Sequence, residues 1–375
     1  MNTRKLLIVT NDFPPRQGGI QSFVYELARR LPAGQLAVYC SDFPEANAFD
    51  GELSFPVLRH PTGLLVPTPG ARRRVLAAAR EFGATSVWFG AAAPLGLLAP
   101  ALRTAGVRRL VATTHGHEVG WTMLPIARQA LRRIGNSVDV VTYLGEYTRR
   151  RLAPAFGPRA TMRQLTPGVD PATFNPDVSG TAIRERYGLQ DRPVVVCVSR
   201  LVPRKGQDTL VAALPAIRRA APGAALLLVG KGPYEKDLRA AAARLGVTEH
   251  VVFTGGVDHE ELPAHFAAGD VFAMPCRTRR FGMDVEGLGI VFLEASASGL
   301  PVIAGDSGGA PDAVRDGVTG RVVDGTSAAA VASEVGRLLT DLALAANYGK
   351  AGREWVEEAW QWDTIAERLA ELLQL

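Results

Sequence analysis

Two glutamates in the second half of the chain have a type and spacing that could bring two carboxylates to one binding site. Glu286 and Glu294 lie eight positions apart in the stretch VEGLGIVFLEA. The loop between them leads into a predicted helix, so backbone N–H groups at Gly289, Ile290 and Val291 would be free to meet a phosphate. Carboxylates accept several strong hydrogen bonds in fixed geometry. We therefore expect Glu286 to bind sugar hydroxyls and Glu294 to bind both ribose hydroxyls.

Cations follow the first strand predicted in the second half of the chain. Arg200, Arg204 and Lys205 lie in SRLVPRKGQD, directly before a predicted helix. A guanidinium and an ammonium at one strand end suit a diphosphate, which arginine can hold through two hydrogen bonds. The next predicted strand ends in VGKGPYEKDL, where Gly230 permits close backbone approach. We expect Arg200, Lys205 and Gly230 to bind such a diphosphate ligand.

The first predicted strand of the chain is followed by a glycine pair and two charged residues. In TNDFPPRQGGIQSF, Gly18 and Gly19 precede a predicted helix whose free N–H groups can hold an anion. Asp12 and Arg16 share this loop and are predicted acceptor contacts. The pattern is not GxGxxG, which argues against a nicotinamide or flavin enzyme.

A histidine-rich stretch, THGHEVGW, follows the fourth predicted strand. His115, His117 and Glu118 could suggest a metal site, but no further ligand with clear spacing follows, so we predict no metal. A histidine at the carboxyl end of a strand can instead steady a sugar hydroxyl or a developing charge. We expect His117 to have that role.

These motifs must be positioned by alternating strands and helices, because each one follows a short apolar run. The predicted strands are 6–10, 36–40, 86–89, 110–114 and 138–143 in the first half, and 194–198, 225–229, 251–253, 271–274 and 302–304 in the second. Helical spacing over 19–30, 71–82, 126–135, 207–220 and 234–245 lies between them. Such alternation predicts an α/β fold with two parallel, doubly wound, Rossmann-like domains facing a cleft. Ligands bind beyond the carboxyl ends of such strands.

The length of 375 residues predicts two domains rather than one. We place them at residues 1–168 and 169–357, with a hinge in the Pro/Gly-rich stretch 165–176.

No apolar run is long enough for a transmembrane helix, and three widely spaced cysteines favour a cytoplasmic protein without structural disulfides. Residues 1–168 hold 21 Lys and Arg against 10 Asp and Glu, which predicts an anionic partner for the first half.

Taken together, these motifs resemble the large retaining GT-B glycosyltransferase family that includes relatives of glycogen and sucrose synthases, family 4. More narrowly, VTNDFPPRQGGIQSF, FGAAAPLGLLAP, THGHEVGW, SRLVPRKGQD and DVEGLGIVFLEA resemble the actinobacterial PimB-type phosphatidylinositol mannosyltransferases. The resemblance implies transfer of mannose from GDP-mannose to phosphatidylinositol monomannoside, which gives the dimannoside, with no metal or other cofactor. It also implies that the final helix, about 358–375, packs back on the first domain.

Roles for individual residues follow from this resemblance. His117, Glu286, Arg200 and Lys205 would be the catalytic residues, because catalysis there consists of positioning and of stabilising leaving-group charge. The donor-binding set would be Gly18, Gly19, Arg200, Lys205, Gly230, Val257, Glu286, Gly289, Ile290, Val291 and Glu294. Two departures from the family pattern are the long stretch CRTRRFGMD before Glu286 and Asp312, where relatives commonly have Glu.

A lipid acceptor and the basic first half together predict peripheral association with an anionic membrane, on the inner face of the plasma membrane. Leu64, Leu65 and Val66 precede three arginines in HPTGLLVPTPGARRR, and apolar insertion beside basic residues suits such a surface. WTMLPIARQALRRIG, residues 121–135, offers a second mixed surface.

Three other functions remain open on the residues alone. The first is a GT-B transferase with another donor or glycolipid acceptor, since the residues are compatible with GDP or UDP. The second is a sugar-nucleotide 2-epimerase, which shares the two-domain fold but is expected to lack the SRLVPRKG and Glu-x7-Glu combination. The third, a nucleic-acid-binding protein, is disfavoured because the basic residues are not interleaved with aromatics and no recognition motif occurs.

Overall fold

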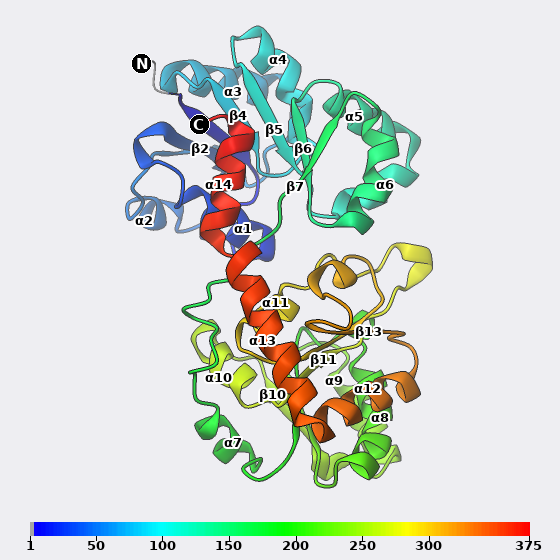
Figure 1. Ribbon diagram of the computed structural model, residues 1–375. Coiled ribbons are helices and arrows are strands. Elements are labelled where there is room, and N and C mark those ends of the chain that lie inside the picture. Colours follow the sequence, from blue (N-terminus) through cyan, green and yellow to red (C-terminus); the bar gives the residue numbers. More distant parts are fainter. Residues whose placement is uncertain (1–3) are drawn as a thin grey trace. The chain divides into compact units, whose positions relative to one another are not determined.

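The computed structural model describes residues 4–375 and divides into two compact units (Figure 1). Among the described residues, unit 1 consists of residues 4–168 and 362–375, and unit 2 of residues 169–361. Each unit is a parallel sheet covered by helices, which is the predicted α/β architecture.

Unit 1 is built on a seven-stranded sheet in the order β3-β2-β1-β4-β5-β6-β7, with every pairing parallel. Its strands are β1 (Leu6–Thr10), β2 (Leu36–Ser41), β3 (Val57–His60), β4 (Ser86–Phe89), β5 (Arg109–Thr113), β6 (Val140–Tyr143) and β7 (Thr161–Gln164). Its helices are α1 (Gly19–Ala28), α2 (Ala46–Asp50), α3 (Pro69–Phe82), α4 (Ala99–Thr104), α5 (Pro125–Gly135), α6 (Glu146–Phe156) and α14 (Trp362–Leu373), with a 3-10 helix, η3, over His117–Met123. Central strands β1, β4 and β5 are almost wholly buried, which is why they are continuous apolar runs in the sequence.

Unit 2 has a six-stranded parallel sheet in the order β10-β9-β8-β11-β12-β13. Its strands are β8 (Val194–Val198), β9 (Ala225–Val229), β10 (Val251–Gly255), β11 (Val271–Met274), β12 (Val302–Gly305) and β13 (Gly320–Val323). Its helices are α7 (Thr181–Tyr187), α8 (Gln207–Ala220), α9 (Glu235–Arg244), α10 (Leu262–Ala267), α11 (Ile290–Ala297), α12 (Ala328–Thr340) and α13 (Leu342–Ala359).

The last helix, α14, completes the core of unit 1. Ile365, Leu369 and Leu373 are fully buried and share one apolar cluster with strand residues such as Ile8 and Trp88. The chain therefore passes between the units twice. The two passages meet unit 1 side by side, because a Cβ atom on Gly168 would come within 2.6 Å of the backbone of Trp362.

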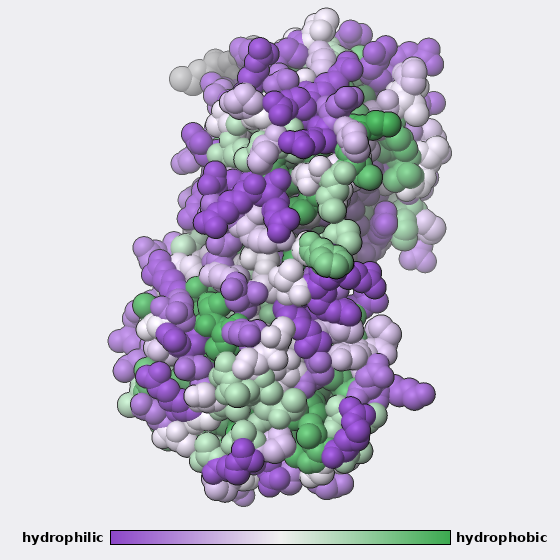
Figure 2. Space-filling view, turned by 90° about the vertical axis from the view of Figure 1, so that its right-hand side faces the viewer, coloured by the Kyte–Doolittle hydropathy of each residue, from purple (hydrophilic) through white to green (hydrophobic). Residues whose placement is uncertain are grey.

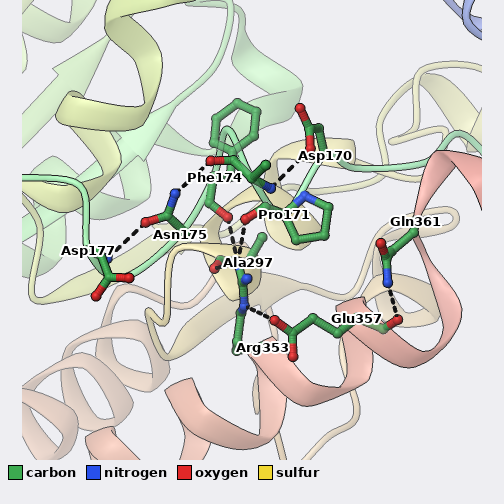
Figure 3. Close-up of polar contacts among 10 residues, drawn as sticks. Asp170, Pro171, Phe174, Asn175, Asp177, Ala297, Arg353, Glu357 and Gln361 are labelled. Carbon is green, nitrogen blue, oxygen red and sulfur yellow. Dashed lines mark hydrogen bonds and ion pairs between the residues drawn. The ribbon is translucent and has the colours of Figure 1, made fainter.

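Unit 2 begins with a segment that is fastened by one arginine (Figure 3). Arg353 of α13 donates hydrogen bonds to the carbonyl oxygens of Pro171, Phe174 and Ala297, and pairs with Glu357. Val169 also donates its backbone N–H to the carbonyl oxygen of Trp360 at 2.7 Å. The predicted hinge stretch 165–176 is therefore ordered by contacts with α11 and α13 after its first residues.

All ten predicted strands are present, but β3, β7 and β13 were not predicted. β7 lies at an edge of its sheet and three of its four residues, in TMRQ, are exposed. β3 and β13 are edge strands too, with only partly buried patterns. An edge strand buries less surface, so it lacks the apolar run that marks a central strand.

Candidate functional site

The centre of the candidate site in unit 2 is a buried ion pair. The ammonium of Lys205 lies 2.6 Å from a carboxylate oxygen of Glu286, with the two side chains only 11% and 8% exposed. This contact is an ion pair rather than a regularly oriented hydrogen bond. Two residues 81 positions apart, predicted to serve the diphosphate and the sugar, are thus in direct contact. A buried cation beside a buried carboxylate can bind a phosphate oxygen and a hydroxyl side by side.

The backbone around Glu286 is held by the glycine turn that follows β12. Gly309 donates its N–H to the carbonyl oxygen of Glu286 at 2.9 Å, and Ser307 lies within 3.4 Å of the Glu286 N–H. A Cβ atom on Gly308 or Gly309 would come within 2.0 or 2.1 Å of carbonyl oxygens of the Glu286 turn. The sequence GDSGGAPD therefore needs its glycines because this turn packs directly against the site.

Helix α11 starts beside this turn and carries Glu294. Gly289 precedes the helix in a left-handed conformation, and its N-terminal residues Ile290 and Val291 are partly buried. Glu294 is a partly exposed residue, but desolvation of its carboxyl group raises the pKa to about 7. A hydrogen-bond donor beside this carboxyl group would stabilise its ionised form and lower its pKa again.

Arg200 is exposed at the carboxyl end of β8, and Gln207 holds its backbone. The Gln207 side-chain amide donates to the Arg200 carbonyl oxygen at 3.0 Å and to the Ser199 hydroxyl at 2.9 Å. Gly230 packs against the same strand end, since a Cβ atom there would lie 2.2 Å from the Ser199 carbonyl oxygen. Gln207 was not among the predicted site residues. Its position directly after the RKG turn was the only signal in the sequence.

The stretch CRTRRFGMD before Glu286 forms a small hairpin, and charged residues hold its base in place. Arg279 and Asp284 exchange backbone hydrogen bonds at 2.9 and 3.2 Å. The carboxylate of Asp284 also contacts Arg279 at 3.4 Å and Arg204 at 3.6 Å. Arg277 donates its backbone N–H to the Arg204 carbonyl oxygen at 2.8 Å. The hairpin is therefore tied to the residue that precedes Lys205.

In unit 1 the loop after β1 brings Asp12 under the start of α1. Gln21 donates a side-chain hydrogen bond to Asp12 at 2.8 Å. Gly18 leaves room for the Gln21 side chain, because a Cβ atom at Gly18 would lie 2.2 Å from the Gln21 side-chain oxygen. Burial raises the pKa of Asp12, while the charges of Arg16 and His117 lower it in part. Asp12, Arg16 and His117 thus share one electrostatic environment.

His117 is positioned by a buried carboxylate. Glu118 is fully buried, accepts the backbone N–H groups of His115 and Gly116 at 3.0 and 3.1 Å, and lies 3.5 Å from the His117 ring. His115 contacts the Gly90 carbonyl oxygen at 2.6 Å, and burial lowers its pKa to about 4. His115 is therefore neutral and structural. Glu118, for which the sequence suggested only a metal-ligand role, orders the loop that presents the half-exposed His117.

Within residues 4–375, no group of three or more histidine, cysteine, aspartate or glutamate side chains is arranged to hold a metal ion. The three cysteines are free and buried. In each unit the predicted residues lie at the carboxyl ends of the strands. Unit 1 brings together Asp12, Arg16, His117 and the Gly18–Gly19 turn. Unit 2 brings together Lys205 and Glu286, with Arg200, Gly230, Val257, Gly289, Ile290, Val291 and Glu294 on the same sheet edge and its loops.

Two surfaces of unit 1 combine apolar and basic residues, as predicted, with one correction. Leu65 is not exposed but fully buried, because Asn11 pins its backbone through two hydrogen bonds of 2.6 and 2.8 Å. Leu64 and Val66 beside it remain exposed. The expectation failed at Leu65 because alternation within an apolar run cannot show which side chain turns inward.

The second surface, here named the α5 surface, consists of Met123, Leu124, Ile126, Arg128 and Arg132. Its three apolar side chains are 62%, 62% and 84% exposed. Figure 2 views this side of the molecule, and green side chains gather there on the unit that carries α5. Over the described part of the chain, none of the helices has the length and apolar character required to pass through a bilayer.

Comparison with known proteins places this geometry in a family. The family model "Glycosyltransferase Family 4" matches residues 17–173, and "Glycosyl transferases group 1" matches residues 180–355. A protein of Mycolicibacterium smegmatis named GDP-mannose-dependent alpha-(1-6)-phosphatidylinositol monomannoside mannosyltransferase is 58% identical, covering 98% of both chains. A protein of the same name from Mycobacterium tuberculosis is 56% identical, covering 99% of this chain and 98% of its own.

Among solved structures, Anabaena Alr3699/HepE in complex with UDP superposes with a TM-score of 0.82 at 22% identity, covering 99% of each chain. This likeness concerns the fold, which is the GT-B arrangement of two Rossmann-like domains predicted from the resemblance. The two family models between them span most of the chain, and the named relatives match it nearly from end to end. The chain therefore belongs to the same glycosyltransferase family as these mannosyltransferases.

Proposed function

We propose that this protein is a retaining α-mannosyltransferase that moves mannose from GDP-mannose to a phosphatidylinositol mannoside lipid, converting the monomannoside to the dimannoside. The observation that carries the proposal is the buried Lys205–Glu286 pair, in which Lys205 lies just before α8 and Glu286 lies in the loop before α11. It supplies a cation for a diphosphate and a carboxylate for a sugar at one place. The names of relatives at 58% and 56% identity supply the donor and the acceptor.

In this proposal unit 2 holds the donor. Lys205 and the exposed Arg200 bind the diphosphate, and Glu286 accepts hydrogen bonds from mannose hydroxyls. Glu294 accepts those of the ribose, while the N-terminus of α11 and the backbone near Val257 complete the nucleotide site. The cations supply the charge stabilisation that a metal ion supplies elsewhere, so we propose that no metal is required.

Unit 1 supplies the acceptor contacts, with Asp12 and Arg16 for the lipid headgroup and His117 for a hydroxyl of the transferred mannose. For a front-face displacement the acceptor hydroxyl attacks the anomeric carbon as the bond to the diphosphate oxygen breaks. The leaving oxygen takes the proton of the hydroxyl. No side chain then needs to act as a general base, and catalysis consists of positioning and of stabilising the leaving diphosphate.

The decisive experiment is transfer of sugar-labelled mannose from GDP-mannose into a membrane lipid extract. We expect labelled lipid and released GDP. Glu286→Ala and Lys205→Ala should each reduce transfer by about 100-fold or more. Lys350→Ala and Glu354→Ala are matched controls, because these residues form an exposed ion pair on α13 and should leave transfer unchanged.

Each competing function gives a different result in the same assay. Label that stays out of the lipid fraction contradicts the acceptor. Turnover of UDP-sugars but not GDP-mannose indicates another donor, and conversion of the nucleotide sugar without any acceptor indicates an epimerase. Wild-type rates in the Glu286 and Lys205 variants contradict the assignment of the site.

We further propose that the protein binds the anionic inner face of the plasma membrane peripherally, through the α5 surface. Its exposed Leu124 and Ile126 can enter the interface while Arg128 and Arg132 meet lipid phosphates, at about 1 kcal/mol per basic residue. Sedimentation with anionic vesicles tests this. Leu124→Asp with Ile126→Asp should reduce binding at least tenfold, whereas an equal loss in Leu64→Asp alone would favour the 60–74 surface instead.

A further inference from the structure

The hairpin Arg279–Asp284 in unit 2 presents two large apolar side chains to solvent. Phe281 is fully exposed and Met283 is 59% exposed. Between them Gly282 is buried, so the two side chains lie on the outside of the turn. In Figure 1 the yellow segment that follows β11 extends outward from the rest of this unit. Nothing in unit 2 covers this apolar tip among its described residues.

The backbone of the tip is held in an unfavourable conformation. Arg280, Phe281 and Gly282 have φ angles of 49°, 55° and 88°. The left-handed region suits glycine, but a bulky residue such as Phe281 adopts it only at a cost in free energy. The turn therefore carries the cost of a strained backbone, and its aromatic ring adds nothing to stability because it is not buried. Such a combination is expected where a segment contacts something outside its own unit.

The root of the hairpin is fixed to the donor-binding residues. Asp284 contacts Arg204, which directly precedes Lys205, and Arg277 bonds the Arg204 backbone. Thr278 lies 3.3 Å from Ser307, whose hydroxyl also lies 3.4 Å from the backbone N–H of Glu286. The apolar tip is therefore held at a set distance from the Lys205–Glu286 pair. A surface that the tip contacts therefore meets the same group of loops that carries Lys205 and Glu286.

Positive charge surrounds the tip. Arg280 is exposed next to Phe281, and Arg279 and Arg204 share the single carboxylate of Asp284. The hairpin itself holds two cations against one anion, and Arg204 beside its base adds a third positive charge. Apolar side chains flanked by arginines suit the interface of an anionic lipid surface, where the rings enter the acyl boundary and the guanidinium groups meet phosphates. An apolar protein partner would not explain the charge.

We propose that the hairpin Arg279–Asp284 is a second lipid-contacting element, which inserts Phe281 and Met283 into the edge of an anionic lipid surface beside the donor site. The inference deepens the proposed function and rests on it, because it assumes that the acceptor is a lipid. Its consequence is that unit 2, and not only the basic unit 1, contacts the membrane. The hairpin then serves to bring a membrane-embedded headgroup to the donor sugar.

The buried state of the native cysteines makes a direct test possible. Cys40, Cys197 and Cys276 are buried, so Phe281→Cys introduces a selectively reactive thiol. A polarity-sensitive thiol fluorophore at this position should shift to the blue with vesicles of equal phosphatidylglycerol and phosphatidylcholine. Spin-labelled lipids in those vesicles should quench it. Leu342→Cys is the matched control, because Leu342 is 73% exposed at the start of α13 and its label should stay unchanged.

A second variant separates contact with lipid from folding. Phe281→Gly removes the strained ring, so we expect its Tm to be unchanged or raised and its GDP affinity to equal that of the wild type. Transfer to vesicle-embedded acceptor should nevertheless fall roughly tenfold. A lowered Tm together with normal transfer would show that the ring is structural, and this outcome would overturn the inference.

Two further results would contradict lipid contact by the hairpin and would leave the proposed function unaffected. The first is a label at residue 281 that does not respond to anionic vesicles while the protein still sediments with them. The second is a blue shift on addition of GDP-mannose without vesicles, which would show that the ring packs on protein. Failure of the proposed function would instead appear as absent mannose transfer by the wild-type protein, whatever the label reports.

Discussion

Lys205 and Glu286 form a buried ion pair, and each charge is compensated by the other. The contribution of either residue to the free energy of unfolding therefore depends on whether its partner is present. A charge that loses its partner in a buried position costs about 3 kcal/mol or more, whereas an apolar pair of similar volume can be tolerated. The same pair can open when a diphosphate offers Lys205 a new anion and mannose offers Glu286 its hydroxyls. The ion pair is thus a contact within the fold, and in the proposed function the same two residues also bind the donor.

This coupling predicts strongly non-additive mutations. Lys205→Met and Glu286→Leu should each lower the free energy of unfolding by about 3 kcal/mol, because each leaves one buried charge unpaired. The double variant leaves no buried charge unpaired, so it should be less destabilised than either single variant. Urea unfolding of the four proteins measures this. Additive losses would mean that the two side chains do not interact.

The ionisation of Glu294 predicts a pH dependence for nucleotide binding. Desolvation raises its pKa to about 7, so the carboxylate form is lost as pH falls through 7. Ribose hydroxyls donate to the charged form, and binding therefore favours it. GDP affinity should rise with pH up to about 8 and fall below 7 by up to about tenfold per pH unit.

Calorimetric titration with GDP between pH 6 and 8 is the measurement. Glu294→Gln is the control, because it keeps the shape but cannot ionise. The titration of the GDP phosphate is common to both proteins and cancels in their ratio. Parallel curves for the two proteins would contradict a role of Glu294 in ribose binding. Without nucleotide, the same raised pKa means that the stability contributed by Glu294 is present below pH 4.5 and is lost as pH rises through 7.

At the scale of elements, the site of unit 2 depends on two turns that pack against each other. The turn after β12 contacts the backbone before α11, through Gly308 and Gly309. Glu286 is thus placed by a neighbouring strand as well as by its own loop. In unit 1 the corresponding placement is made by Glu118 inside η3 and by Gln21 inside α1.

A pair of glycine substitutions tests this packing. Gly309→Ala would put a Cβ atom 2.1 Å from the Gly287 carbonyl oxygen, so the two turns must move apart and the Gly309–Glu286 hydrogen bond must break. We expect Tm to fall by several degrees and transfer to fall at least tenfold. Gly287→Ala in the facing turn has no neighbour within 4 Å of its Cβ position and should keep the Tm. Equal Tm values for the two variants would show that the turns are not in contact.

At the scale of the whole molecule, the two units are linked by a chain that returns. Helix α14 follows unit 2 in sequence but supplies Ile365, Leu369 and Leu373 to the core of unit 1. Unit 1 is therefore incomplete until the last residues of the chain are present. Arg353 fastens the other passage by satisfying three carbonyl groups of unit 2.

Removal of residues 362–375 should unfold unit 1 selectively. Each of the three buried side chains contributes about 2 kcal/mol, and their sum approaches the whole stability of a domain. We expect limited proteolysis to cut unit 1 rapidly, while unit 2 stays resistant and still binds GDP. A truncated chain whose two halves resist proteolysis equally would show that α14 is dispensable. Replacing exposed Glu367 and Glu371 by alanine is the control that leaves the buried face intact.

From the sequence alone we predicted the central strands, several of the helices between them and the motifs at the strand ends. These features are local, because a buried parallel strand is a continuous apolar run and a ligand-binding turn follows it directly. The edge strands β3, β7 and β13 escaped prediction because their partial exposure removes that signal. Only the tertiary structure decided that Lys205 pairs with Glu286, that Leu65 is buried and that Phe281 is not. These outcomes depend on which distant segments pack together, and hydrophobic periodicity carries no information about that choice.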